Sequence, residues 1–207
     1  ATDVILGLSL KEQGFFDIYP AEKERWYVKA PVFSFNKIRG LDAYLTPEMK
    51  STGEAIGYDR TMTRALYKAL QASGMKLQNY GTVLATIADR DKEEALPLIR
   101  RFYRLGFNIE ATRGTAEFLK ANGIRTRIRK KLSEGSEEIL DSIRQGYVNY
   151  IINTRDMNSS GVLSDGYEIR QCAVENNVTM FTALDTVKVL LDVLEEITLS
   201  VSTIDAK

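Results

Sequence analysis

The second part of the chain repeats one pattern that limits its fold more than any other feature. From about residue 81 onward, short runs rich in β-branched residues are each followed by a turn and an amphipathic helical pattern that closes on glycine or asparagine. This alternation is typical of strand–helix units whose strands lie parallel in one sheet. We therefore expect an α/β fold with a five-stranded parallel sheet flanked by helices. The predicted strands are 82–86 (TVLAT), 107–112 (FNIEAT), 125–130 (RTRIRK), 148–154 (VNYIINT) and 178–182 (VTMFT).

The first helix of this pattern is predicted within 91–105. Asp91 and Glu94 have the spacing of a capping box, and Gly106 suits the left-handed residue that ends a helix. Pro97 removes an amide donor inside the helix, so we expect a kink or a later helix start. The last helix of the pattern is predicted over 184–197.

Residues 1–80 follow a different rhythm. The stretch 4–14 (VILGLSLKEQG) predicts a helix, and another is expected from a cap at Asp59 to about Ser73. Between them lies a section punctuated by glycine and proline, with too few strands for a sheet of its own. With residues 75–80 as a linker, we expect a partial first domain over 1–79, whose remainder is missing, and a second domain over 80–207.

The chain has no histidine and a single cysteine, Cys172. Catalysis by Ser-His-Asp or Cys-His systems and zinc sites that use histidine are therefore excluded, and any catalysis would rest on carboxylates, lysine or tyrosine. One cysteine also excludes an intramolecular disulfide framework and fits a reducing, cytoplasmic setting. Because Cys172 follows Ile169 by three residues in a predicted helix, we expect a buried structural thiol.

Charge and hydropathy exclude two classes of partner. The formal net charge is +0 and the isoelectric point about 6.7, so nothing steers the molecule toward nucleic acid. No apolar run approaches the roughly 20 residues that span a bilayer. The basic run 125–131 alternates, which places Arg125, Arg127 and Arg129 on one face of a strand. A solvated face of an edge strand is the favoured interpretation of this run.

Polar residues follow the predicted strands where ligands bind in open parallel sheets, beyond the carboxyl ends of the strands. Cations, hydroxyls, an amide and a glycine turn are what a phosphate group requires. Taken singly, a threonine at a strand end is more often a helix cap than a ligand, and Lys92 or Lys131 is more often a solvated side chain. The candidate phosphate-binding residues are Thr86, Lys92, Thr112, Arg113, Gly114, Thr115, Lys131, Asn153 and Thr154. Neither GxxxxGK[ST] nor GxGxxG occurs, which argues against P-loop and dinucleotide enzymes.

Several motifs together resemble the carboxyl-terminal part of the carbamoyl-phosphate synthase large chain, and the resemblance covers essentially the whole sequence. The motifs are PVFSFNK (31–37), PEMKSTGEAIG (47–57), TIADRDKEEA (86–95), GFNIEATRGTAEFL (106–119) and YIINT (150–154). The resemblance implies that residues 1–79 end the second ATP-grasp unit. It also implies that residues 80–207 form the methylglyoxal-synthase-like allosteric domain.

The same resemblance implies a function. The full-length enzyme is a glutamine-dependent ligase that uses ATP with Mg or Mn to make carbamoyl phosphate for pyrimidine and arginine synthesis, and its partner is the glutamine amidotransferase small chain. In this family the allosteric domain binds nucleotide effectors such as UMP, and phosphoribosyl pyrophosphate in some members. The fragment itself is expected to contain no catalytic residue, cofactor or metal. Arg113 stands where many bacterial relatives have histidine.

The sequence also allows two other classes of function. A methylglyoxal-synthase-type lyase acting on dihydroxyacetone phosphate shares the threonine-rich phosphate loop. However, that enzyme carries its catalytic aspartate in a Gly-Gly-Asp-Gln motif, which is absent here, and its histidine has no counterpart. A purely structural interaction module would leave the strand-end residues unused.

Overall fold

The computed structural model describes residues 1–16, 22–37, 43–44, 46–154 and 165–199. Strands and helices alternate regularly only in the second part of the chain. The strands are β1 Trp26–Val32, β2 Gly53–Asp59, β3 Thr82–Thr86, β4 Asn108–Thr112, β5 Thr126–Arg129, β6 Tyr150–Asn153 and β7 Thr179–Phe181. The α-helices are α1 Thr2–Ile5, α2 Met62–Ala72, α3 Lys92–Arg104, α4 Arg113–Ala121, α5 Glu138–Arg144, α6 Asp165–Glu175 and α7 Leu184–Leu199. The short 3-10 turns are η1 Phe35–Lys37, η2 Asp89–Asp91 and η3 Leu132–Glu134.

The predicted sheet is confirmed. Strands β3 to β7 form one sheet in the order β5-β4-β3-β6-β7, and every neighbouring pair is parallel. The bounds of β3 are those expected, and the other four strands are shorter than predicted by one or more residues at their ends. No helix in the described part of the chain is long and apolar enough to cross a membrane.

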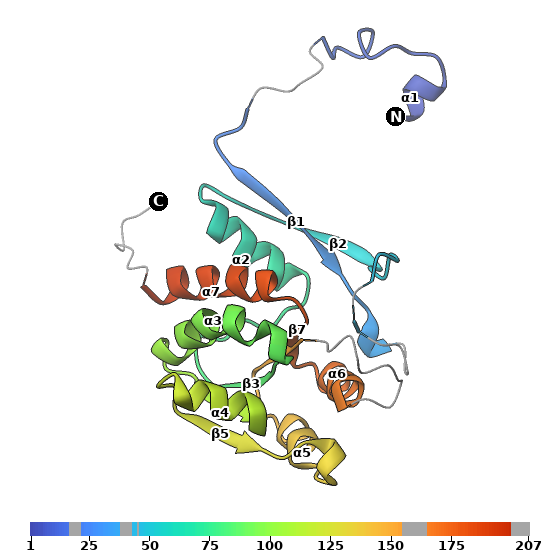
Figure 1. Ribbon diagram of the computed structural model, residues 1–207. Helices are drawn as coiled ribbons and strands as arrows, with labels where there is room; N and C mark the ends of the chain where they lie inside the picture. Colours follow the sequence, from blue (N-terminus) through green and yellow to red (C-terminus); the bar gives the residue numbers. More distant parts are fainter. Residues whose placement is uncertain (17–21, 38–42, 45, 155–164, 200–207) are drawn as a thin grey trace.

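Helices cover both faces of the sheet (Figure 1). Side chains alternate along each strand, so Val83 and Ala85 contribute to one apolar cluster and Leu84 to another. The first cluster is completed by α3, α4 and α7, and the second by α5 and α6. The domain therefore has three layers, and β6, next to β3 near its centre, is buried along its whole length.

The path of the chain creates a switch point between β3 and β6. From β3 the chain passes through α3 and α4 to β4 and β5 on one side. It then returns through α5 to β6, which pairs with the other side of β3 and continues through α6 to β7. The carboxyl ends of β3 and β6 thus open toward helices on opposite faces, which is where ligands bind in open α/β sheets.

Helix α3 differs from the expectation at its start. Its buried residues are Ala95, Leu98, Ile99 and Phe102, and Gly106, which follows the helix as expected, has a left-handed φ of 91°. The predicted capping box is wrong, because the side chain of Asp91 accepts no hydrogen bond from the helix. Instead, the turn η2 leads directly into α3, and the helix continues through Pro97 to Arg104.

The expectation for the first part of the chain is wrong in two respects. Only α1 is helical within 4–14, because the chain turns at Gly7 and Gly14 with left-handed φ. This part also contains an antiparallel ribbon, β1 with β2, which was not predicted. In Figure 1, α2 lies between this ribbon and α7.

The predicted cap of α2 is also wrong. Asp59 is the last residue of β2, where it accepts a hydrogen bond from the Arg60 amide and pairs with Lys68 Nζ at 2.7 Å. The helix begins two residues after Arg60, and its cap is Thr61, whose side chain accepts from the Arg64 amide at 3.4 Å.

The basic run 125–131 is only partly solvated. β5 is an edge strand, as expected, and the side chain of Arg127 is 71% exposed. Arg129 differs, because it forms a two-pronged ion pair with the buried Glu110 of β4, at 2.7 and 2.8 Å. The hydrogen bonds that the Glu110 carboxylate accepts raise the pKa of the Arg129 guanidinium. The alternation predicted the correct face, but the carboxylate on the neighbouring strand buries one of its arginines.

Residues 75–80 contain no helix or strand and are held against the sheet domain. Tyr150 of β6 is fully buried, and its hydroxyl accepts from the Gln78 amide at 2.6 Å and donates to the Gln78 carbonyl at 2.8 Å. Burial raises the pKa of Tyr150 to about 12.

We expect Gly57→Ala to destabilise the first part of the chain. A Cβ at Gly57 would overlap the backbone of Ala65 and Ala69 in α2, so the ribbon and helix would have to separate. Overpacking of this kind costs about 1–3 kcal/mol or more. Gly53→Ala in the same strand is the control, since its Cβ would meet only Val32 Cβ at 3.7 Å. Equal urea midpoints for the two variants, measured by circular dichroism, would contradict the prediction.

The buried Tyr150 hydroxyl predicts a specific loss of stability in alkali. In the folded protein the Tyr150 hydroxyl has a pKa of about 12, whereas in the unfolded chain its pKa is near 10.0. Stability is therefore unaffected below pH 10 and falls as the pH rises from 10 to 12, by about 2–3 kcal/mol. The difference in unfolding free energy between wild type and Tyr150→Phe should narrow over this range in urea titrations. For Tyr80→Phe, whose side chain is exposed, the difference should stay constant, and a constant difference for Tyr150→Phe would refute the assignment.

Candidate functional site

Two of the predicted residues meet at the switch point. Thr86 ends β3, and its partner in the register of β6 is Asn153. Asn153 Nδ2 donates to Thr86 Oγ1 at 2.7 Å, and the Thr86 hydroxyl donates to the Ile152 carbonyl at 3.4 Å. The Thr86 hydroxyl is thus used to join the two strands, while the second N–H of Asn153 Nδ2 has no partner among the described residues.

Thr154 and Arg170 fix the surroundings of Asn153. Thr154 Oγ1 accepts from the Ala88 amide at 2.8 Å, which leaves its O–H as a donor. Arg170 of α6 is 5% exposed, and its Nη1 donates to Asn153 Oδ1 at 3.0 Å. This bond orients the amide so that Nδ2 faces Thr86.

Sequence reasoning did not identify Arg170. The available signal was a basic residue between Ile169 and Cys172 on the apolar side of a predicted helix, where an arginine requires a polar partner. The ring of Tyr44 lies 5.7 Å from its guanidinium carbon, so a residue of the first part of the chain also contacts it.

The start of α4 brings the stretch 112–115 to the same edge. Thr112 precedes the helix, but its side chain caps no helix amide, so its interpretation as a helix cap is wrong. Thr112 is 8% exposed, and its hydroxyl has no hydrogen-bond partner among the described residues. Thr115 is buried, and its hydroxyl exchanges hydrogen bonds of 3.4 Å with the backbone of Ile87. The first amides of α4 therefore lack side-chain caps and can donate to an anion.

Lys92 joins the starts of two helices. It is the first residue of α3, and its Nζ donates to the Gly114 carbonyl in α4 at 3.0 Å. Nζ also pairs with Asp89 Oδ1 at 2.6 Å. Of its three N–H groups, one remains beyond these contacts. The cation is thereby held beside the uncapped amides of α4.

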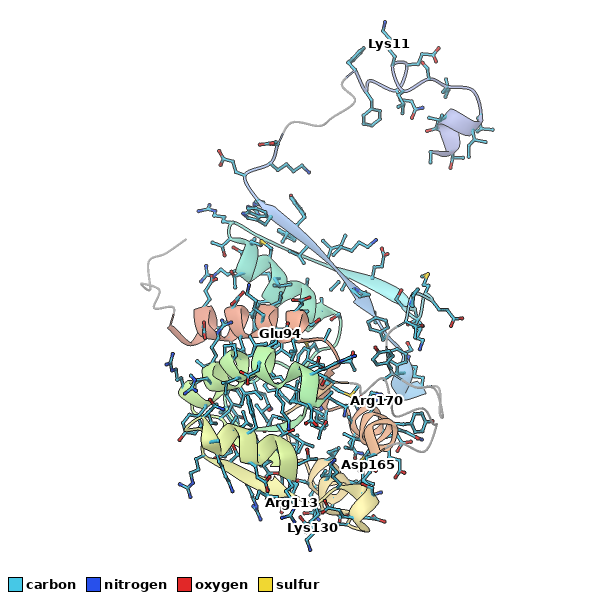
Figure 2. The ribbon with its side chains drawn as sticks, in the orientation of Figure 1. Lys11, Glu94, Arg113, Lys130, Asp165 and Arg170 are labelled. Carbon is cyan, nitrogen blue, oxygen red and sulfur yellow. The ribbon has the colours of Figure 1, made fainter. Side chains whose placement is uncertain are left out.

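Lys131 and Arg113 are exposed cations at the rim of this region. Neither forms an ion pair with a described residue, although the charge of Lys131 is one of the causes that lower the pKa of Asp89. Ser133, two residues after Lys131, donates its amide and hydroxyl to the Asp165 carboxylate at the start of α6. This tie holds the segment that carries Lys131 against α6, and Figure 2 shows Asp165 and Arg170 on that helix.

Together, these contacts connect the ends of neighbouring strands. Direct bonds join β3 to β6, α3 to α4, and residues 87–88, which follow β3, to Thr115 and Thr154. The remaining predicted residues are adjacent in sequence or close enough to act electrostatically. The donors without a described protein partner come from Thr112, Thr154, Asn153, the cations and the α4 amides. Such a set of donors suits a multiply charged oxyanion. Among the described residues there is no cluster of three or more histidine, cysteine or carboxylate side chains that could hold a metal ion.

The single cysteine takes no part in this arrangement. Cys172 is buried in the cluster formed by α5 and α6, as expected, and its Sγ lies 3.8 Å from the Leu140 carbonyl. Burial raises the pKa of its thiol, which makes it a poor nucleophile near neutral pH.

Comparison with known proteins finds a family match within the second part of the chain. The model of the MGS-like domain family matches residues 94–182, from the first turn of α3 to just beyond β7. Among solved structures, the chain is similar to methylglyoxal synthase from Elizabethkingia anophelis NUHP1. The identity is 19%, the TM-score is 0.48, and the match covers 56% of this chain and 79% of that one. Residues 94–182 are therefore an MGS-like domain.

Proposed function

We propose that the strand-end site binds the phosphate group of a nucleotide effector such as UMP. The observation that carries this proposal is the convergence of Lys92, Asn153 and the uncapped start of α4 at the switch point. Each supplies a donor beyond its contacts with the described residues, and the carboxylate that pairs with Lys92, Asp89, is exposed. A phosphate dianion would accept from several of these donors at once, each charge-assisted bond being worth about 1.5–3 kcal/mol.

The wider proposal is that the chain is the regulatory end of a carbamoyl-phosphate synthase large chain. It is supported by the motifs that resemble this family, PEMKSTGEAIG at 47–57 above all, and by the MGS-like domain that follows them. On this proposal the nucleotide controls carbamoyl phosphate synthesis carried out elsewhere in the large chain, with the glutamine amidotransferase as a partner. Phosphoribosyl pyrophosphate is a second candidate effector.

The alternative proposal is a lyase that acts on dihydroxyacetone phosphate. It is supported by the MGS-like fold and by the same phosphate donors. The sequence offers no histidine, and the Gly-Gly-Asp-Gln motif that carries the catalytic aspartate of methylglyoxal synthases is absent. We therefore favour effector binding over catalysis.

Removal of either lysine should weaken UMP binding. We expect Lys92→Ala and Lys131→Ala to raise the dissociation constant roughly ten- to a hundredfold in isothermal titration calorimetry. Lys92→Ala should have the larger effect, because it also leaves the Asp89 carboxylate unpaired. Lys120→Ala removes an exposed lysine at the far end of α4 and should bind like wild type. No heat with UMP, IMP or phosphoribosyl pyrophosphate for the wild-type protein would refute the proposal.

The lyase alternative has its own test. Incubation of the purified chain with dihydroxyacetone phosphate should release no methylglyoxal above the rate without protein, because the residues for enolisation are missing. Dihydroxyacetone phosphate should still compete with UMP through its phosphate group. Release of methylglyoxal by the wild-type protein, together with its loss in Lys92→Ala, would favour the lyase instead.

A further inference from the structure

A carboxylate already occupies part of the candidate site. Asp89 Oδ1 lies 2.6 Å from Lys92 Nζ, and the exposed fraction of the two side chains differs greatly, 16% for Lys92 and 94% for Asp89. Lys92 is held by the Gly114 carbonyl at 3.0 Å, whereas the described residues pack little against Asp89. The cation is therefore fixed, and the carboxylate reaches it from the solvent side.

The charge of Lys131, the second lysine of the site, also acts on Asp89. The hydrogen bond from Lys92 and then the charge of Lys92 are the main causes that lower the pKa of Asp89, and the charge of Lys131 adds to them. The carboxylate thus lies in the combined field of the two lysines that the proposed function assigns to a phosphate.

We propose that Asp89 is a specificity-determining residue that shares Lys92 with the ligand and disfavours ligands in proportion to their negative charge. The inference rests on the proposed function, since it concerns the same site. A phosphate that contacts Lys92 must displace Asp89 or lie beside it. Like unit charges about 4 Å apart weaken binding by roughly fivefold even in bulk water, and the repulsion grows with the charge of the ligand. Asp89 would therefore favour nucleoside monophosphates over triphosphates.

The test compares Asp89→Asn with wild type by calorimetry against UMP and UTP, without divalent cations and at low ionic strength. We expect Asp89→Asn to tighten UMP by at least roughly fivefold and UTP by a larger factor, because the repulsion removed scales with ligand charge. Both gains should shrink at about 0.5 M salt, since an exposed carboxylate is readily screened. Melting curves of the variant should match those of wild type, because an exposed ion pair contributes little stability.

The matched control is Asp91→Asn. This variant loses the same charge two residues away, from a carboxylate that pairs with Arg90 at 3.3 Å rather than with a site lysine. Equal gains for both variants, or equal gains for UMP and UTP in Asp89→Asn, would overturn the role of Asp89. If wild type binds UMP and Asp89→Asn binds it equally well or more weakly, the role of Asp89 is also overturned, but the proposed function is not. Absence of binding in wild type and both variants would overturn the proposed function together with the inference.

Discussion

The pairing of β6 with β3 is the constraint on which the rest of the sheet domain depends. β6 lies between β3 and β7, and all four of its residues are buried, so its side chains contact the helices on both faces. Tyr150 at its start anchors the segment before the sheet through Gln78, and Asn153 at its end joins Thr86. One strand therefore fixes the linker at one edge of the sheet and the candidate site at the other. A different position for β6 would move the switch point and separate the donors.

The sheet could be predicted because each strand has a local signal. Short β-branched runs, amphipathic helices and closing glycines all favour the same strand–helix units, and the polar residues at the strand ends follow from the parallel direction. The strand order is not encoded locally, since it depends on which hydrophobic faces the helices cover. Residues such as Thr86 and Asn153 were therefore identified individually, whereas their hydrogen bond is a result of the order β5-β4-β3-β6-β7.

The first part of the chain was harder to predict for a physical reason. β1 contains Pro31, β2 contains Gly53 and Gly57, and the two strands are separated by a long connection without a tight-turn signal. Gly57 is required because α2 approaches the strand too closely for a side chain, which is a tertiary contact. Asp59 and Thr61 both suit a helix cap, and only the end of β2 decides between them. Arg170 was missed for a similar reason, because its partner Asn153 lies on a different element.

The candidate site combines polar groups that form hydrogen bonds within the protein with donors that have no partner among the described residues. The Thr86 hydroxyl connects β3 with β6, and the Thr115 hydroxyl connects α4 with Ile87, the residue after β3, so both determine geometry even where they donate nothing to a ligand. Lys92 does both, because it fixes Gly114 and retains a donor. For the proposed anion, a site built in this way is preorganised, since its donors lie in place beforehand and little conformational entropy would be lost on binding. On the proposed role of Asp89, the internal bonds hold the donors in place while the exposed carboxylate adjusts the affinity, so substitution of Asp89 would change binding without altering the sheet.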